Sequence, residues 1–588
     1  MRLKITKSKN AMNLYVIEST YINGKHSSRI VEKLGNYDEL KKTLNGRDPI
    51  EWAKEYIQQL NEKLKEDRQE VIVKYSPNKI IKKDEQHVFN GGYLFLQQLY
   101  YELGLDKICK DISDEFNFTY DLNSILSRLV YARIIYPSSK RSTYKLSKKF
   151  IEQPKFELHH IYRALEVIAK KNDYIQTELY KNSSRVSKRN TGILYYDCTN
   201  FFFEIEYEDG FREYGVSKEH RPNPIVQMGL FMDGDGIPLA FSINNGSQNE
   251  QVTLKPLEKK IIKDFNLSKF VVCTDAGLAS YNNKKFNDLR DRAYITTQSI
   301  KKLPKYLKDW ALDPDGWHLF DNKGSCKVYN ITELDEEEDV NKIFFKERWK
   351  NEKGLEERVI VTYSLKYKNY QQKIRNNQIE RAKHLILTNP SKYKLRKNTD
   401  FKRLVEEIHL TPDGEVAQTS KLRINEKLIC EEERYDGFYA VCTNLEDDAH
   451  KIIKVNKNRW VIEECFRIMK SEFKVRPVHL SREDRIIAHF ITCFIALIIY
   501  RLLEKKLGDE FTYHEIIDNL REMNFYQINH DSFVPIYTRN DFTDALHESF
   551  GFRTDYQILT KKIIKNIISN TKTKKVLKYK ENKKSVIF

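Results

Sequence analysis

The sequence predicts a multidomain α/β protein: a mixed five-stranded sheet with helices, interrupted by a mainly β insertion and flanked by helical regions. A length of 588 residues is enough for about three to five domains. Strand and helix patterns alternate between residues 191 and 300, which is typical of an α/β layer. Apolar residues make up 40% and charged residues 31% of the chain, a composition that excludes a disordered protein.

The N-terminal segments differ in hydrophobic period. Residues 1–75 alternate polar and apolar residues between glycine turns, which predicts a small β unit followed by a helix near Pro49–Asp67. Residues 76–190 are predicted to be a helical region, because apolar residues recur there at helical spacing. The first helix of this region is indicated by Leu94, Leu96, Leu99 and Leu103.

Residues 191–300 predict the order three strands, helix, strand, helix, strand, which makes a mixed sheet. Residues 301–450 contain short β-like runs, charge clusters and a helix near Tyr370–Leu385, and they are predicted to be the mainly β insertion. The core is expected to resume over 451–505 with a helix. A helical region over 506–588 ends in a basic tail, where Lys561–Phe588 holds ten Lys against one Glu.

Charge and cysteine content limit the class of protein. The 101 Lys+Arg against 84 Asp+Glu give +17, which favours a polyanionic partner such as nucleic acid, although an AT-biased coding sequence would give a similar surplus. Eight cysteines without a Cys-x-x-Cys pair argue against a disulfide scaffold or structural zinc and fit a reducing cytoplasm. No apolar run follows the N-terminal charges, so no secretory signal is expected. Phe490–Leu503 is too short to span a bilayer and is expected to be a buried helix.

Two aspartates stand in or at the end of apolar strands. Asp197 lies within Leu194–Thr199, and a carboxylate in such a strand is costly unless it is paired or binds a metal ion. Asp275 follows Val271–Thr274, and ligand sites in α/β sheets gather at strand ends. The alternative for each is that the aspartate only caps a turn or a helix.

A third acid lies on an amphipathic helix near residue 463. At 100° per residue its core stripe is formed by Ile462, Phe466, Met469 and Phe473. A second stripe beside it contains Arg459, Glu463, Arg467, Lys470 and Lys474. Glu464 is expected to point into solvent, so the pattern selects Glu463. The alternative is a solvated helix with i,i+4 ion pairs.

Together the three acids suggest a two-metal site. Two divalent ions about 4 Å apart can activate a nucleophilic oxygen and stabilise the leaving oxygen in phosphoryl transfer. Carboxylate ligands suit two Mg²⁺ or Mn²⁺ ions. The basic stripe beside Glu463 would then hold DNA phosphates near the metal ions.

These residues resemble a known family. The helix reads Asn456-x-x-Arg459-x-x-x-Glu463-x-x-x-x-x-x-Lys470, which is similar to the Tyr-Arg-Glu-Lys signature of one group of DDE transposases of bacterial insertion sequences. Three of the four positions match, and Asn456 stands where the group has Tyr. Tyr195–Asn200 and Cys273–Gly277 look like the family's first and second Asp strands, and the long interval before Glu463 looks like its insertion domain.

The resemblance implies a ribonuclease-H-like catalytic core and a cut-and-paste activity on double-stranded DNA. Asp197, Asp275 and Glu463 would be the catalytic metal ligands, and the enzyme would bind terminal inverted repeats, cleave the element ends and join them to target DNA. DNA contacts would come from Arg459, Lys470, Arg467 and Lys474, with Trp460 stacking on a flipped base unless it is a core residue.

The same resemblance implies a homodimer in the synaptic complex, no membrane partner, and a cytoplasmic location that is nucleoid-associated when DNA is bound. Two alternatives stay open. One is a catalytically silent transposase-derived DNA-binding protein, which retention of all three acids disfavours. The other is a metal-dependent nuclease with a ribonuclease-H-like core and no strand joining. The helical N-terminal region and the long insertion favour transposition over the nuclease.

Overall fold

The computed structural model describes residues 1–8, 11–22, 25–44, 46–67, 76–320, 327–388, 393, 400–410, 419–528 and 532–573. The chain divides into two compact units, Met1–Glu85 and Gln86–Phe588, which are described separately. The end of the predicted basic tail, beyond residue 573, lies outside the described residues.

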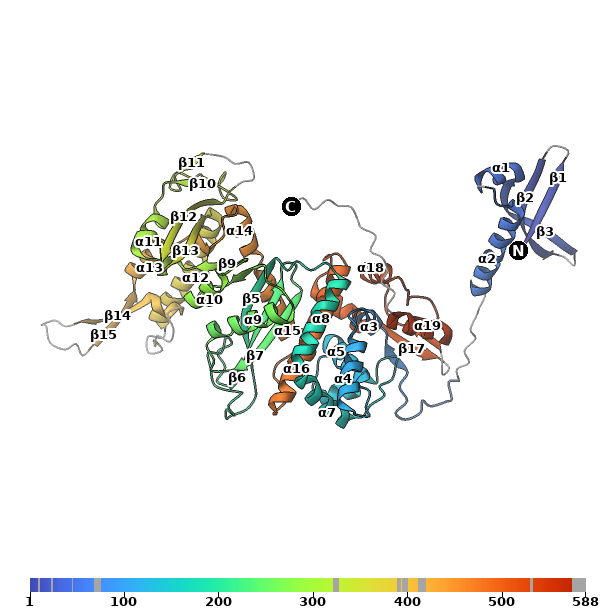
Figure 1. The fold of residues 1–588 in the computed structure, drawn as a ribbon, viewed down its shortest axis with the longest axis horizontal. Helices are drawn as coiled ribbons and strands as arrows, with labels where there is room; N and C mark the ends of the chain where they lie inside the picture. Colours follow the sequence, from blue (N-terminus) through green and yellow to red (C-terminus); the bar gives the residue numbers. More distant parts are fainter. Residues whose placement is uncertain are drawn as a thin grey trace. The chain divides into compact units, whose positions relative to one another are not determined.

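The first unit is a three-stranded antiparallel sheet followed by two helices (Figure 1). Its strands are β1 (Arg2–Ser8), β2 (Ala11–Ile22) and β3 (Lys25–Asn36). Helix α1 (Tyr37–Thr43) begins where the Asn36 side chain accepts a hydrogen bond from the Asp38 amide. Helix α2 (Pro49–Asp67) starts on proline, whose missing N–H costs nothing at a first helical position.

The second unit begins with strand β4 (Val88–Asn90) and a group of helices. Side-chain caps define several of their starts: Asp121 accepts from the Ser124 amide, and Ser139 accepts from the Ser142 amide. The helices are α3 (Tyr93–Glu102), α4 (Leu105–Phe116), α5 (Leu122–Ile135), α6 (Lys140–Ser147), α7 (Leu158–Lys170) and α8 (Asn172–Val186).

The predicted order of elements between residues 191 and 300 is confirmed, with one 3₁₀ turn (Glu250–Val252) added before the first helix. Strand β5 pairs with β6 antiparallel and with β8 parallel, so the sheet is mixed. The elements are β5 (Ile193–Phe202), β6 (Ile225–Asp233), β7 (Pro238–Asn245), α9 (Leu254–Asp264), β8 (Phe270–Thr274), α10 (Tyr281–Asn287) and β9 (Arg292–Gln298).

The sheet has ten strands rather than the predicted five, in the order β11-β10-β12-β13-β16-β9-β8-β5-β6-β7. The reason is that β16 (Phe438–Thr443) pairs antiparallel with β9, so the edge of β9 is continued by strands from the predicted insertion. Those strands are β10 (Trp317–Leu319), β11 (Val328–Tyr329), β12 (Phe344–Glu352) and β13 (Leu355–Tyr363).

The predicted insertion also contains helices and one small sheet of its own. Helix α12 (Leu365–Thr388) has 24 residues and confirms the helix predicted near Tyr370–Leu385. Strands β14 (Val405–Leu410) and β15 (Thr419–Ile424) pair only with each other. The shorter helices are α11 (Lys305–Leu312), the 3₁₀ turns Ile300–Lys302 and Phe401–Leu404, and α13 (Glu426–Glu433).

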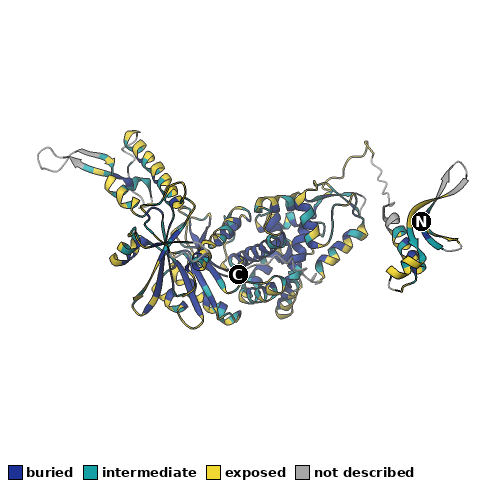
Figure 2. Cartoon of the chain, turned by 90° about the horizontal axis from the view of Figure 1, so that it is seen from above, coloured by how far each residue is buried: buried dark blue, intermediate teal, exposed yellow. Residues whose placement is uncertain are grey.

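Helices α14 (Ala449–Lys457), α15 (Trp460–Ser471) and α16 (Glu483–Lys506) follow the sheet. Helix α16 is the one described helix that is long and apolar enough to cross a membrane, and 94% of its most apolar 18-residue window is buried inside the protein. Figure 2 shows that many of the helices in the middle of the picture carry buried residues. The prediction of a buried helix over Phe490–Leu503 is confirmed.

The C-terminal region contains strands as well as helices. Strand β4 from the N-terminal side pairs with β17, and β17 pairs with β18, so the two ends of this unit meet in one small sheet. The elements are α17 (Tyr513–Glu522), β17 (Asn524–Ile528), β18 (Ser532–Pro535), α18 (Asp541–Phe550) and α19 (Lys561–Lys572).

Both faces of the large sheet are covered at β5. Successive side chains of a strand point to opposite faces. Tyr195 packs in the core that contains α14–α16, and its hydroxyl donates to the Val455 carbonyl at 3.1 Å. Tyr196 and Cys198 pack on the other side in the core that contains α9. Asp197 therefore shares the face of Tyr195, toward α14 and α15.

Candidate functional site

Asp197 and Asp275 are brought side by side by strand register. In the parallel pair β5–β8, Tyr195 lies opposite Cys273. Asp197 lies two residues beyond Tyr195 on β5, and Asp275 lies two residues beyond Cys273, directly after the end of β8. Neighbouring strands are about 4.8 Å apart. The Asp275 charge is close enough to raise the pKa of Asp197. The sequence-predicted pair of acids is thus adjacent in the fold.

The Asp197 carboxyl group lies in a strand whose neighbouring residues are buried. Burial raises its pKa to about 6, the Lys218 charge opposes this shift, and the Asp275 charge adds to it. The Cys198 amide donates to Asp197 Oδ1 at 2.8 Å, and the Arg459 charge also favours the ionised form. Burial and the Asp275 charge thus disfavour ionised Asp197 more than the nearby cations favour it. Such a carboxylate is suited to bind a cation, because a bound cation would offset the free-energy cost of ionising it in a buried position.

Asp275 also performs the local role that the alternative interpretation gives it. Its Oδ1 accepts a hydrogen bond from the Leu278 amide at 3.1 Å, so the side chain does cap the turn after β8. Capping uses one oxygen and leaves lone pairs on both. A Cβ on Gly277 would lie 3.3 Å from each carboxylate oxygen, so glycine keeps this side of Asp275 open.

Glu463 approaches the two aspartates through Arg459. Arg459 Nη2 lies 3.2 Å from Glu463 Oε1, and the same guanidinium acts electrostatically on Asp197. The Glu463 side chain is 58% exposed. Among the described residues, the three potential ligands whose donor atoms all lie within 4.8 Å of one another are Asp544, His547 and Asp555. Glu463 therefore shares the Arg459 guanidinium with Asp197, but the donor atoms of the three acids do not all lie within 4.8 Å of one another.

The cluster Asp544–His547–Asp555 is a poor candidate for a metal site. Arg553 Nη2 lies 3.0 Å from Asp544 and also pairs with Asp555, while Arg539 pairs with Asp544 at 2.8 Å. Both carboxylates are thus already neutralised by guanidinium groups, which a divalent ion would have to displace.

The expectation that Glu464 points into solvent is wrong. Its side chain is only 17% exposed, with Oε2 3.5 Å from Arg501 Nη1 and Oε1 3.5 Å from Arg467 Nη2. The physical reason is that α16, which carries Arg501, packs beside α15 and covers this part of the helix. A helical projection of one helix contains no information about that neighbour.

The predicted basic stripe on α15 divides into two groups. Arg459 and Lys470 face Asp197, and Lys470 Nζ lies 3.3 Å from Glu219 Oε1. Burial lowers the pKa of Lys470 to about 8. Arg467 instead pairs with Glu464, and Lys474 lies beyond the end of the helix. The predicted DNA contacts of Arg459, Trp460, Arg467, Lys470 and Lys474 stay predictions.

Two charged residues near Asp197 were missed by sequence reasoning. Lys218 donates a hydrogen bond to the Cys198 carbonyl and pairs with Glu250 at 3.3 Å. Glu219 pairs with both Lys470 and Arg476. Both residues lie in the connection 203–224 between two antiparallel neighbours, where a short turn would suffice. The excess length of this connection was the one signal in the sequence that could have pointed to these two residues.

Asn456 has a structural role at the position where the resembled signature has Tyr. It is buried, and its Nδ2 donates to the Tyr439 hydroxyl at 2.7 Å. The Cys273 thiol lies 3.6 Å from its Oδ1. Asn456 therefore ties α14 to β16 and to β8, the strand that carries Asp275.

Comparison with known proteins gives a family for this arrangement. The family model described as "Transposase DDE domain" matches residues 201–499, about half of the chain. Among solved structures, a piggyBac transposase synaptic complex with hairpin DNA is 9% identical, with a TM-score of 0.35, covering 83% of this chain and 86% of that one. A Mos1 transposase paired-end complex with left transposon end is 13% identical, with a TM-score of 0.13, covering 40% of this chain and 64% of that one. No curated protein matches.

Proposed function

This chain belongs to the transposase DDE domain family, and from that premise we propose a cut-and-paste DNA transposase acting by metal-dependent phosphoryl transfer. Its substrates would be the terminal inverted repeats of its own element and a target DNA. The observation that carries the proposal is the register of β5 and β8, which sets Asp197 beside Asp275. Arg459, at the start of the helix that bears Glu463, acts on Asp197 and pairs with Glu463.

Asp197 and Asp275 fit a hard divalent cation, because they offer adjacent carboxylates and Gly277 leaves one side of Asp275 open. Glu463 would complete the ligand set. Mg²⁺ or Mn²⁺ held there, as a pair of ions, would activate the attacking oxygen and stabilise the leaving one. Arg459 and Lys470 would position the scissile phosphate, since both carry charge toward Asp197.

Finer features belong to the same proposal. We place a ribonuclease-H-like core in the strands β7-β6-β5-β8-β9, supported by two acids on adjacent parallel strands, Asp197 within β5 and Asp275 directly after β8. Three matching signature positions favour the Tyr-Arg-Glu-Lys group of bacterial insertion sequences. Cutting two element ends together would need a homodimer in the synaptic complex. The enzyme would act in the cytoplasm, on the DNA of the nucleoid.

The experiment uses the DNA that flanks this gene. The full chain should shift a labelled duplex carrying the flanking inverted repeat, and it should cut that duplex at the repeat end in Mg²⁺ but not in EDTA. Joining of the freed 3′ ends to a target plasmid separates the transposase from the nuclease alternative. Binding without any cleavage in Mg²⁺ or Mn²⁺ would instead establish the silent DNA-binding alternative.

Trp460 provides a separate prediction. Its side chain is 56% exposed, so the Trp460→Ala variant should unfold at nearly the wild-type temperature. Stacking on a nucleic-acid base contributes about 1–3 kcal/mol, so end-DNA affinity should fall by about five- to 150-fold. Fluorescence anisotropy with labelled end DNA measures the affinity. The matched control is Trp349→Ala, which removes another exposed tryptophan, on β12. Equal affinities for the two variants would show that Trp460 does not stack on DNA.

A further inference from the structure

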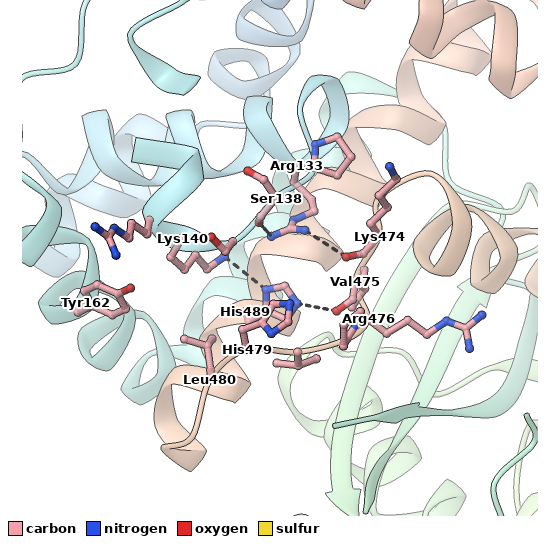
Figure 3. A pocket seen from close by; sticks show the side chains of 15 residues that line it. Arg133, Ser138, Lys140, Tyr162, Lys474, Val475, Arg476, His479, Leu480 and His489 are labelled. Atoms are coloured by element: carbon pink, nitrogen blue, oxygen red, sulfur yellow. Dashed lines mark hydrogen bonds between the residues drawn. The ribbon is translucent and has the colours of Figure 1, made fainter. Parts of the chain in front are cut away.

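A cationic pocket of about 440 Å³ lies between the α5–α6 corner and the segment 474–480 that follows α15 (Figure 3). We call it the Lys140 pocket. No Asp or Glu is among the fifteen described residues that line it. Its positively charged lining residues are Arg133, Lys140, Arg141, Lys474 and Arg476, joined by the imidazoles of His479 and His489.

Lys140 is the most unusual group in this pocket. It is only 5% exposed, and among the described residues its one hydrogen-bond partner is His489, with Nζ 3.3 Å from Nδ1. His489 Nε2 lies 3.1 Å from the Val475 carbonyl, which can only accept, so Nε2 carries the hydrogen and Nδ1 accepts from Lys140. An ammonium group has three N–H donors, and this arrangement uses one. No carboxylate in the described part of the chain pairs with Lys140, although buried lysines are otherwise almost always paired.

Arg133 adds a second buried cation that no described carboxylate pairs with. Its Nη1 donates to the Phe473 carbonyl at 3.0 Å and its Nη2 to the Ser138 carbonyl at 3.1 Å, while its Nε has no hydrogen-bond partner among the described residues. These bonds fix the two walls of the pocket to each other but leave the positive charge uncompensated. The N-terminus of α6 at Lys140 faces the same space and adds partial positive charge.

The pocket adjoins the candidate catalytic site through one carboxylate. Glu219 pairs with Lys470, which faces Asp197, and also with Arg476, which lines the pocket. Arg141 and Lys474 are exposed at the pocket rim. A polyanion bound at the candidate site could therefore extend into this neighbouring pocket.

We propose that the Lys140 pocket binds a phosphate group, with Lys140 and Arg133 supplying buried charge and Arg141 and Lys474 supplying charge at the rim. A single carboxylate would leave several of these cations unpaired, whereas phosphate accepts hydrogen bonds on several oxygens. This inference rests on the proposed function for its source: the phosphate is a backbone phosphodiester of bound DNA.

Binding is expected to weaken as pH rises. Burial, with Arg133 nearby, lowers the pKa of Lys140 to about 7, so the ammonium form dominates only below that pH. The groups that face Lys140 are Arg133 on α5, His489 and Cys493 on α16, and the pocket residues Arg141 and His479. The pKa of His489 lies well below its usual range, so His489 stays neutral. Sulfate, whose charge is constant here, should bind more tightly at pH 6 than at pH 8. His479→Gln should keep this dependence, and Lys140→Met should lose it.

The first test uses sulfate alone with the full chain. Melting temperature is measured in sulfate and in chloride at matched ionic strength, because sulfate also stabilises proteins nonspecifically. Wild type should gain several degrees in a saturable way, and Lys140→Met should gain only the nonspecific part. The matched control is Lys145→Met, an exposed lysine on the same helix outside the pocket. Without sulfate, Lys140→Met should melt no lower than wild type, since it removes a buried unpaired charge. Equal sulfate responses in all three proteins would overturn the proposal.

A surface variant keeps the test valid if Lys140→Met folds poorly. Arg141→Ala changes an exposed side chain and should reduce the sulfate response by about half or more. An unchanged response in Arg141→Ala, with Lys140→Met unfolded, would also overturn the proposal.

The second test identifies the source of the phosphate. Affinity for a labelled duplex is measured in EDTA across a salt series, so that cleavage plays no part. Lys140→Met should bind about five- to tenfold more weakly and lower the slope of log K against log salt by about 1, while Lys145→Met should match wild type. If Lys140→Met loses the sulfate response but binds DNA with unchanged affinity and salt slope, the phosphate does not come from DNA. The ligand of the pocket would then be a free phosphate compound. If the wild-type protein does not cleave DNA but keeps the sulfate response, the proposed activity is refuted and phosphate binding in the pocket is not.

Discussion

Replacing Asp275 by alanine is expected to reduce Mg²⁺-dependent cleavage of end DNA by at least about a thousandfold, equivalent to about 4 kcal/mol of transition-state stabilisation. The reason is that Asp275 supplies one of two adjacent carboxylates, and Asp197 alone cannot hold the ions in place. DNA affinity should stay within about twofold of wild type, because the phosphate contacts come from cations on other elements.

Single-turnover cleavage of the labelled end duplex measures this loss, with gel shift in EDTA as the measure of binding. The matched control is Asp291→Ala, an exposed aspartate just before β9, at the opposite end of the parallel strands from Asp275. Cleavage by Asp275→Ala at the rate of Asp291→Ala would show that the metal assignment is wrong.

Replacing Asp233 by alanine should lower the free energy of unfolding by about 3–5 kcal/mol, the usual cost of breaking a buried ion pair from one side. Asp233 is fully buried and pairs with Arg189, whose side chain is 2% exposed. Asp233 Oδ1 also accepts from the amides of Asp235 and Ile237 at 3.1 and 2.9 Å. These contacts show that the Asp233 side chain fixes the geometry of the turn Asp233-Gly234-Asp235-Gly236.

Urea denaturation followed by tryptophan fluorescence and circular dichroism gives the change in stability. Asp235→Ala is the control, because Asp235 lies in the same turn but is exposed, and its stability should change by less than about 1 kcal/mol. A loss below about 1 kcal/mol in Asp233→Ala would show that Arg189 finds another partner when Asp233 is removed.

Local patterns were sufficient to predict the order of elements from β5 to β9, because each strand is apolar and each turn carries its own signal. They could not predict the ten-stranded sheet. The pairing of Ala440 with Gln298 joins strands about 140 residues apart, and nothing in either strand specifies its partner. The residues of the predicted insertion therefore extend the core sheet.

The candidate site was predictable where chemistry and strand position coincide, as at Asp197 and Asp275. It was not predictable where contacts between segments distant in the sequence determine the position of a side chain. Lys218 reaches Asp197 from a long connection, and Lys140 is buried by contacts between α6 and α16. Glu464 was misplaced in solvent because Arg501 comes from a different helix.

Anomalous diffraction from crystals of the full chain with end DNA and Mn²⁺ would locate the catalytic metal ions directly. We expect Mn²⁺ bound to the carboxylates of Asp197 and Asp275, with Glu463 turned from Arg459 toward the ions. Mn²⁺ bound only at Asp544, His547 and Asp555, or no Mn²⁺ at Asp197 and Asp275, would contradict it.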